Sequence, residues 1–423
     1  MQAGAAEGDI TPPVGVDLTG YVARLGHSVG VHDALHARAL VLEDGETRAA
    51  IVVCDLLALA DETVQAARDV IATAIGTVPG NVMVAGTHTH SGPATIFLHK
   101  CGEIDPRYVA TLPGTLGEIA AAAAARLEPA RVAVGLGDLP QGAFNRRGSG
   151  LVPDTSVGVV RITRPDGTAI ATLMTYGCHP VVMGPDNLLI SADYPGVAVR
   201  TVAEALGGTA LFMTGACGDV NPVRRGTFAE VVWLGEAVAA EAVRVAESLG
   251  EGEVGQLTCA SEVLALPLLP VADRDAHATT AEACRLALFE AETRGEPVAI
   301  RTARAMLDWA ESLAARMDRG EVLTTVRAEV QAIGLGPAVL VGVPGELFSS
   351  LGARIKAQGS GRQVLVAGYT NGDIGYIPDA GAYAVGGYEV SDAFKYYDAP
   401  AALAPEAGER VVEAAHRLCA SLG

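Results

Sequence analysis

Apolar runs that end abruptly in polar, reactive residues recur along this chain and constrain its fold more than any other feature. In the first such run, residues 82–85 lead into His88 and His90 and then into a turn signal. Short apolar runs bounded by turn residues indicate buried strands. Side chains two residues apart on an extended chain lie on the same side, so we expect His88 and His90 to face one pocket. Two imidazoles in one pocket suit a metal ion, or one ligand next to one acid/base group. The alternative is a buried pair of histidines that form hydrogen bonds.

The same design returns at later strand ends, which carry His179, the Asp219 loop, Glu346 and the Tyr376 loop. Strands that alternate with helices predict an α/β fold, in which loops at strand ends converge on a site. Two or three histidines with a carboxylate form a ligand set for Zn²⁺ with one open position. Each residue also has an ordinary structural interpretation: His179 as a capped core histidine, Glu346 as a helix N-terminal charge.

We expect a single domain over residues 1–423, with no repeats, coiled coil or linker. A charged, Ala-rich stretch at about 270–325 interrupts the alternation of strands and helices. It carries no recognisable chemistry, and we expect it to form a helical insertion or cap.

Charge and composition exclude several functions. The net charge is −19, which argues against binding to nucleic acid or to anionic membranes. The longest aliphatic run, residues 119–125, is far shorter than the ~20 residues that span a bilayer. The N-terminus shows no secretory signal, and the seven cysteines are scattered, so we expect a cytoplasmic protein without stable membrane association. Homo-oligomer formation is left open.

Several enzyme classes lack their motifs here. The chain has no Gly-x-Ser-x-Gly elbow, Walker loop, His-Glu-x-x-His or EF-hand string. Ser91 beside His90 does not form a triad, because adjacent residues of a strand point to opposite sides.

The polar strings resemble those of the neutral ceramidase family, in its zinc-dependent amidase domain. The strings that carry the resemblance lie at residues 86–93, 145–146, 178–180, 218–222, 344–346 and 375–376. The resemblance implies an α/β fold: a mixed-sheet catalytic domain with helices packed around it. It also implies that this chain lacks the C-terminal immunoglobulin-like domain of the secreted members.

Carried over residue by residue, the resemblance implies roles for eight side chains. The implied Zn²⁺ ligands are His88, His179, Glu346 and Tyr376. His90 would lie beside the metal, near the scissile carbonyl, and Arg146 and Tyr388 would help to hold the oxyanion. Asn221 stands where the family has a serine that has been discussed as catalytic. Asn221 is no nucleophile, but its amide can still donate a hydrogen bond.

The resemblance implies a zinc-dependent hydrolase that cleaves a C–N amide bond with metal-activated water. Aromatic residues make up only 4% of the chain and form no lipid-facing stripe, so we expect a small, soluble amide rather than a long-chain sphingolipid. Three alternatives remain: a zinc hydrolase of an ester, lactone or cyclic amide, a non-catalytic relative that binds a small ligand, and a purely structural zinc.

Overall fold

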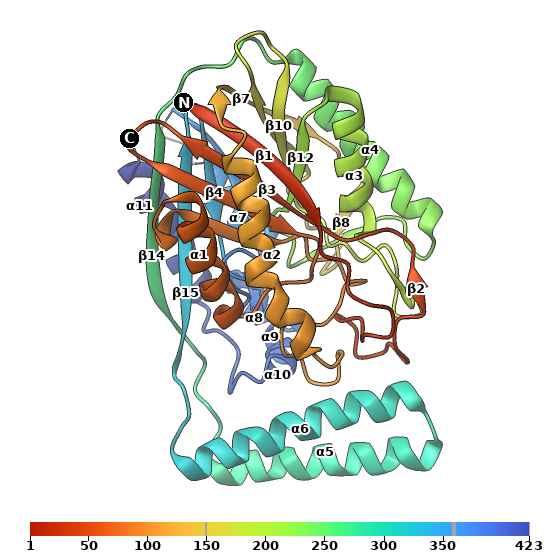
Figure 1. Ribbon diagram of the computed structural model, residues 1–423. Coiled ribbons are helices and arrows are strands. Elements are labelled where there is room, and N and C mark those ends of the chain that lie inside the picture. Colours follow the sequence, from red (N-terminus) through yellow and green to blue (C-terminus); the bar gives the residue numbers. More distant parts are fainter. Residues whose placement is uncertain (149, 358–360, 423) are drawn as a thin grey trace.

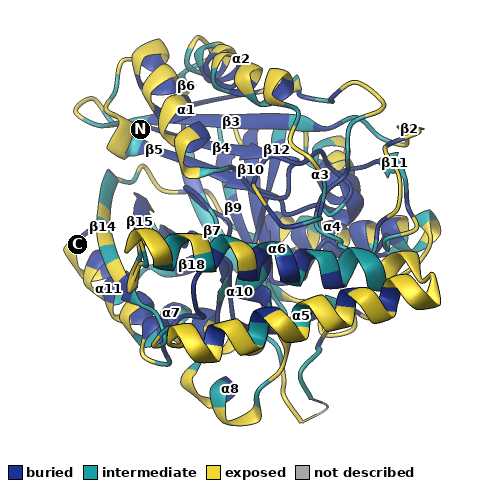
Figure 2. Cartoon of the chain, turned by 90° about the horizontal axis from the view of Figure 1, so that it is seen from below, coloured by how far each residue is buried: buried dark blue, intermediate teal, exposed yellow. Residues whose placement is uncertain are grey.

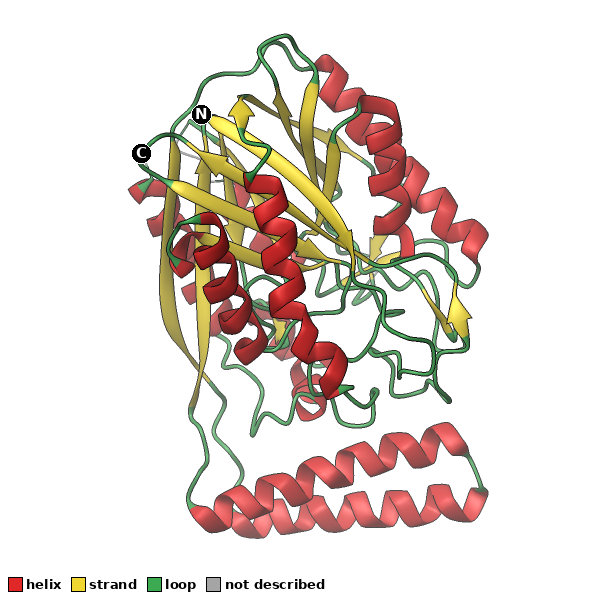
Figure 3. Ribbon diagram, viewed as in Figure 1, coloured by secondary structure: helices red, strands yellow, loops and turns green. Residues whose placement is uncertain are grey.

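The fold is built on three large sheets, each covered on its outer face by a pair of helices (Figures 1 and 3). This computed structural model describes residues 1–148, 150–357 and 361–422. Each large sheet combines antiparallel pairs with one parallel pair, which confirms the expected mixed-sheet α/β class.

The first sheet has the strand order β5-β4-β3-β1-β6 and is covered by α1 and α2. Its elements are β1 (Gln2–Asp9), β3 (His36–Glu43), β4 (Arg48–Cys54), β5 (Val82–Gly86), β6 (Glu128–Pro129), α1 (Asp61–Ile75) and α2 (Pro106–Ala124). The 3-10 turn η1 (Pro79–Asn81) precedes β5. Pro106 takes the first position of α2, where a missing N–H costs no helical hydrogen bond, and the Asp105 side chain caps the helix.

The second sheet has the order β12-β10-β9-β7 and packs against α3 and α4. Its elements are β7 (Arg131–Asp138), β9 (Ser156–Thr163), β10 (Ala169–Tyr176), β12 (Thr209–Thr214), α3 (Asp193–Leu206) and α4 (Phe228–Ser248). Thr227 and Glu230 form a reciprocal capping box at the start of α4.

The third sheet has the order β14-β15-β16-β18 and is covered by α7 and α11. Its elements are β14 (Leu257–Pro267), β15 (Thr325–Leu335), β16 (Ala338–Gly342), β18 (Gln363–Ala367), α7 (Ser349–Lys356) and α11 (Ala407–Ser421). A central apolar core joins the three sheets through fully buried residues such as Leu40, Leu173 and Leu340. The three sheets therefore share one hydrophobic core.

Smaller elements lie at the ends of these sheets. They are β2 (Gly30–Val31), β8 (Ala143–Asn145), β11 (Leu189–Ile190), β13 (Val220–Pro222), β17 (Glu346–Leu347), β19 (Tyr376–Ile377), α8 (Ala380–Val385), α9 (Tyr388–Ser391) and α10 (Ala393–Tyr396). Pairing of these short strands joins loops that are far apart in the sequence: β8 with β13, and β17 with β19.

Between β14 and β15, residues 270–325 contain the two long helices α5 (Arg274–Arg294) and α6 (Pro297–Arg319). They pack against each other as a hairpin below the three sheets (Figure 1). Gly295 ends α5 in the left-handed conformation, and Pro297 starts α6.

No helix in the described part of the chain is long and apolar enough to cross a bilayer.

Candidate functional site

The carboxyl ends of the parallel strand pairs in the three large sheets meet at one place in the fold. Backbone hydrogen bonds join the loops that follow these strands: Gly86 N–H donates to the Tyr369 carbonyl (3.1 Å), and Gly368 N–H donates to the Thr214 carbonyl (2.9 Å). His88 follows β5, and His179 follows β10. Loops from all three sheets therefore build one site, as expected for strand ends in α/β proteins.

His88 reaches the site through a left-handed backbone conformation, with φ +66°. The extended geometry expected for residues 88–90 is wrong, because β5 ends at Gly86. The His88 N–H donates to the Leu56 carbonyl (2.8 Å), and its Nδ1 donates to the Leu57 carbonyl (3.0 Å). These bonds hold a conformation that is unfavourable for a histidine, and such strain concentrates at functional sites.

His179 is oriented in the same way as His88. Its Nδ1 donates to the carbonyls of Cys217 (2.6 Å) and Val220 (3.1 Å). A carbonyl oxygen can only accept, so Nδ1 carries a proton in both histidines and Nε2 is the nitrogen that can bind a metal ion or a second proton. His179 Nε2 lies 2.9 Å from Glu346 Oε2, and His88 Nε2 lies 3.6 Å from the same oxygen.

These distances test whether the site fits a metal ion. A nitrogen lone pair and a carboxylate oxygen repel each other at 2.9 Å unless a positive species lies between them. Without a metal, that species is an extra proton on the His179 ring. With a metal, it is the cation, and both carbonyl-bound Nδ1 atoms provide the outer-shell support that metal-binding histidines require. The donor set of buried imidazoles and a carboxylate therefore fits a divalent cation.

The pKa values agree with shared positive charge around Glu346. Burial opposes charge on both members of the His179–Glu346 pair, but their mutual attraction holds the pKa of Glu346 down at about 2. The neighbouring Cys217 and the hydrogen bond to Glu346 raise the pKa of His179 to about 10 despite its burial. Burial lowers the pKa of His88 to about 3, which keeps that ring neutral. A neutral ring is the form that binds metal.

His90 faces the same cluster. Its Nε2 lies 3.2 Å from His88 Nε2, and potential ligand atoms of His88, His90 and His179 all lie within 4.8 Å of one another. The His90 ring packs against Gly20, where a Cβ would lie only 2.3 Å from His90 Nδ1. Gly20 also has φ +92°, so two independent constraints require glycine beside His90. These distances place His90 beside His88 and His179, next to any ion that those two rings bind.

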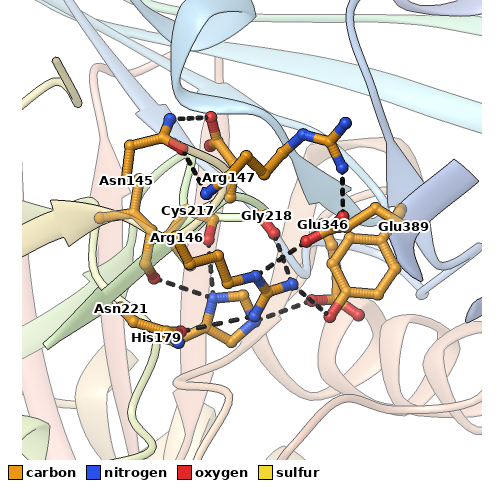
Figure 4. A network of polar contacts seen from close by, with 12 residues as sticks. Asn145, Arg146, Arg147, His179, Cys217, Gly218, Asn221, Glu346 and Glu389 are labelled. Carbon is orange, nitrogen blue, oxygen red and sulfur yellow. Dashed lines mark hydrogen bonds and ion pairs between the residues drawn. The ribbon is translucent and has the colours of Figure 1, made fainter. Parts of the chain in front are cut away.

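Arg146 enters the site from the loop after β8, and its guanidinium group is engaged by protein groups (Figure 4). Nε donates to Glu389 Oε1 (2.9 Å), and Nη2 donates to the Gly218 carbonyl (2.8 Å) and the Tyr376 hydroxyl (3.1 Å). Nη1 makes a longer contact with Asn221 Oδ1 (3.4 Å). Arg146 is thus a fixed positive charge at the site wall, and Asn221 accepts from it.

Glu389 has no role in the sequence-based interpretation, yet it neutralises two arginines. It pairs with Arg146 and with Arg147, and its own side chain is only 5% exposed. A carboxylate this well buried needs such partners. We therefore regard Glu389 as the residue that fixes the orientation of Arg146.

Three tyrosines surround Glu346 and Arg146. Tyr376 pairs with Glu346 in the parallel β17–β19 register, although the two residues are far apart in the sequence. The Tyr388 ring lies 5.7 Å from the Tyr376 ring, centroid to centroid, and is partly exposed. Tyr397, which the sequence-based interpretation does not include, donates its hydroxyl to Glu346 Oε1 (2.7 Å). No motif string contains Tyr397, so only the fold reveals this contact.

All eight residues singled out from the sequence line one cavity of about 350 Å³. They are His88, His90, Arg146, His179, Asn221, Glu346, Tyr376 and Tyr388. The remaining wall combines apolar groups such as Leu57 and Leu98 with Tyr21 and Arg225. The structure thus brings the expected residues together, whereas their individual chemical roles stay predictions.

Comparisons with known proteins agree with this arrangement. In the curated sequences, a neutral ceramidase from Pseudomonas aeruginosa is 28% identical over 247 residues, which cover 52% of this chain and 36% of that protein. Neutral ceramidase B from Dictyostelium discoideum is 27% identical over 258 residues, covering 53% of this chain and 36% of that protein. The matched region thus spans only about a third of these relatives.

Solved structures show the same fold. The crystal structure of the neutral ceramidase from Pseudomonas aeruginosa matches 99% of this chain and 74% of its own with a TM-score of 0.75 and 19% identity. A structure described as a ceramidase complexed with C2 matches 100% of this chain and 75% of its own with a TM-score of 0.76 and 19% identity. The family model for the N-terminal part of neutral/alkaline non-lysosomal ceramidases matches residues 1–235, more than half of the 423 residues. This chain therefore belongs to the neutral/alkaline non-lysosomal ceramidase family.

Proposed function

We propose that this chain is a metal-dependent hydrolase that cleaves the C–N bond of an N-acyl amide, with zinc as the first candidate metal. The proposed ligands are His88, His179, Glu346 and Tyr376. The observation that carries the proposal is that backbone carbonyls hold Nδ1 of both histidines, which leaves two Nε2 lone pairs beside Glu346. When bound, a cation of this kind supplies Lewis acidity, which polarises a carbonyl and makes water nucleophilic near neutral pH.

The chain's own side chains supply positioning and proton transfer in this proposal. Water oxygen bonds to the acyl carbon, the C–N bond breaks, and a proton reaches the leaving nitrogen. The His90 ring is neutral at rest, because burial holds its pKa well below the usual value, so it accepts a proton from the attacking water and passes that proton to the leaving nitrogen. The Tyr388 hydroxyl and the fixed charge of Arg146 stabilise the negative charge that develops on the acyl oxygen.

The substrate class in this proposal includes amides of the ceramide type. The relatives named above are neutral ceramidases, so the comparisons lend no support to our expectation that ceramide is excluded. The cavity of about 350 Å³ has both apolar and polar walls, which suits an N-acyl amide with a short chain and a polar amine part. Short-chain N-acyl amides are therefore the first substrates to assay.

The test combines elemental analysis with matched substrates. We expect the purified protein to bind about one zinc ion per chain and to hydrolyse a short-chain N-acyl amide. His90→Ala should retain zinc and lose about 10²–10⁴-fold in kcat on the amide, because an amine leaves poorly without a proton. The loss should be much smaller on the matched ester. A protein that binds zinc but hydrolyses neither substrate would contradict the proposal, and equal losses on both would favour the ester or lactone alternative.

A further inference from the structure

One cation in the site cavity stands apart from the charges described so far. Arg225 lines the cavity and lies in the loop between β13 and α4. Its Nε donates to the Val181 carbonyl (2.9 Å), which anchors the guanidinium group at the cavity wall. Within the described residues, Arg225 forms no ion pair, whereas Arg146 is paired with Glu389 and Glu346 with His179. The cavity thus carries one positive charge without a protein counter-charge.

The neighbours of Arg225 do not neutralise it. Tyr21 lies beside the guanidinium group, and burial raises the pKa of its hydroxyl to about 12 despite that positive charge, so it stays neutral at physiological pH. The Tyr21 hydroxyl donates to the Met183 carbonyl (3.1 Å). Asp193 is buried nearby, but it accepts hydrogen bonds from the backbone N–H groups of Met183 and Tyr194 and not from Arg225. The Arg225 guanidinium group is therefore available to pair with an anion from outside the protein.

The position of Arg225 indicates which part of a substrate would carry that anion. Tyr21 lies next to both Arg225 and the His90 ring, with 4.9 Å between the Tyr21 and His90 ring centroids. In the proposed reaction, His90 gives its proton to the leaving nitrogen. Arg225 is therefore on the amine side of the scissile bond, and an anion attached to the amine part would reach it.

We propose that Arg225 selects substrates whose amine part carries an anionic group, so that N-acyl amino acids are preferred over neutral N-acyl amino alcohols. This inference rests on the proposed amide hydrolysis at the same cavity. Arg225 is exposed, so solvent screens its contact with a carboxylate, and a charge-assisted hydrogen bond adds to that weakened attraction. We expect a preference of roughly tenfold in kcat/KM, mostly through KM.

The experiment compares two substrates that differ only in charge: N-octanoylglycine and N-octanoylethanolamine. Wild-type protein loaded with zinc should prefer the acid roughly tenfold, and Arg225→Gln should bring the ratio of kcat/KM values close to one. Arg224→Gln is the matched control, because the Arg224 guanidinium group stacks 4.3 Å over the Trp233 ring and does not line the cavity. The control should keep the wild-type ratio. An unchanged ratio in Arg225→Gln would overturn the inference.

A binding measurement separates this inference from the proposed function. Calorimetric titration of metal-free protein should show tighter binding of N-octanoylglycine than of N-octanoylethanolamine, with the difference lost in Arg225→Gln and reduced by added salt. If zinc-loaded protein cleaves neither compound but this binding difference is present, the hydrolase proposal fails and the role of Arg225 stands. If both compounds are cleaved and bound alike, the role of Arg225 fails and the hydrolase proposal stands.

Discussion

The site at the strand ends and the α5–α6 hairpin are held together by different kinds of polar contact. At the site, Glu389 is 5% exposed and pairs with two arginines, and Glu346 is 3% exposed and contacts two histidines. The hairpin lies on the surface with much of its length exposed (Figure 2). Its ion pairs to the body are Lys100–Asp308, with side chains 35% and 27% exposed, and Arg316–Asp398, with side chains 19% and 27% exposed. Water can replace a lost partner at the hairpin but not at the site.

This difference predicts that substitutions at the site are much more costly than substitutions at the hairpin. The hairpin does approach the site: Ala305 of α6 packs in one apolar cluster with Leu57 and Leu98, which line the cavity. Contact with the cavity wall therefore does not by itself distinguish the two regions. The two regions differ instead in how deeply their charged side chains are buried.

The largest effect should come from His88→Ala, which removes a proposed ligand. We expect loss of bound metal and a fall in activity of at least ~10³-fold, equivalent to about 4 kcal/mol of transition-state stabilisation. His416→Ala is the control, because His416 forms a hydrogen bond with the Arg354 carbonyl (3.1 Å) and is not among the residues that line the cavity. Elemental analysis and kcat/KM measure both proteins. Unchanged metal content in His88→Ala would contradict the ligand assignment.

The next largest effect should come from Glu389, whose carboxylate pairs with two arginines. Glu389→Gln leaves Arg146 and Arg147 without a carboxylate, so we expect the free energy of unfolding to fall by about 3 kcal/mol. Glu409→Gln is the matched control. The side chains of Glu409 and its partner Arg354 are 39% and 50% exposed, so their ion pair should contribute at most about 1 kcal/mol. Urea denaturation measures both variants. Equal losses would show that burial is not the deciding factor.

Elements with strong local signals could be predicted from the sequence. The helix at 61–75 has acidic residues in its first turn and Gly76 at its end, and α1 has these bounds. The strand β1 could not be predicted, because its Ala- and Gly-rich sequence has little strand propensity. It is a strand because it pairs with β3 along its whole length. The Ala-rich composition predicts a helix over residues 115–127, whereas α2 runs from Pro106 to Ala124, because the internal Pro113 conceals the helical pattern before residue 115.

The site was predictable where short motif strings mark its residues, and not where a contact depends on the tertiary fold. Seven of the eight expected residues lie in those strings, Tyr388 is the exception, and all eight line the cavity. Glu389 and Tyr397 were missed, because their partners Arg146 and Glu346 are 243 and 51 residues away along the chain. The spacing of His88 and His90 did indicate a shared pocket, but the assumed extended backbone between them was wrong.

A smaller effect should follow from Tyr397→Phe, which removes the hydroxyl that donates to Glu346 and leaves the ring in place. Outer-shell changes of this kind typically cost 10–100-fold in metal affinity or activity, so we expect a loss in that range. Tyr383→Phe is the control, because its hydroxyl donates to the Leu403 carbonyl, outside the cavity. Competition with a chelator measures metal affinity. Equal affinities for the two variants would mean that Tyr397 does not support Glu346.

The smallest effect should come from the hairpin. Asp308→Asn removes the charge that pairs with Lys100, and a half-exposed pair of this type contributes below about 1 kcal/mol. A double-mutant cycle with Lys100→Met isolates the pair from the other contacts of α6, such as the hydrogen bond from Trp309 Nε1 to the Ala399 carbonyl (2.8 Å). We expect a small coupling energy that falls further with added salt, and a change in kcat/KM of a few-fold at most. A coupling energy as large as the loss in Glu389→Gln would mean that the hairpin is as integral to the site as the buried ion pairs.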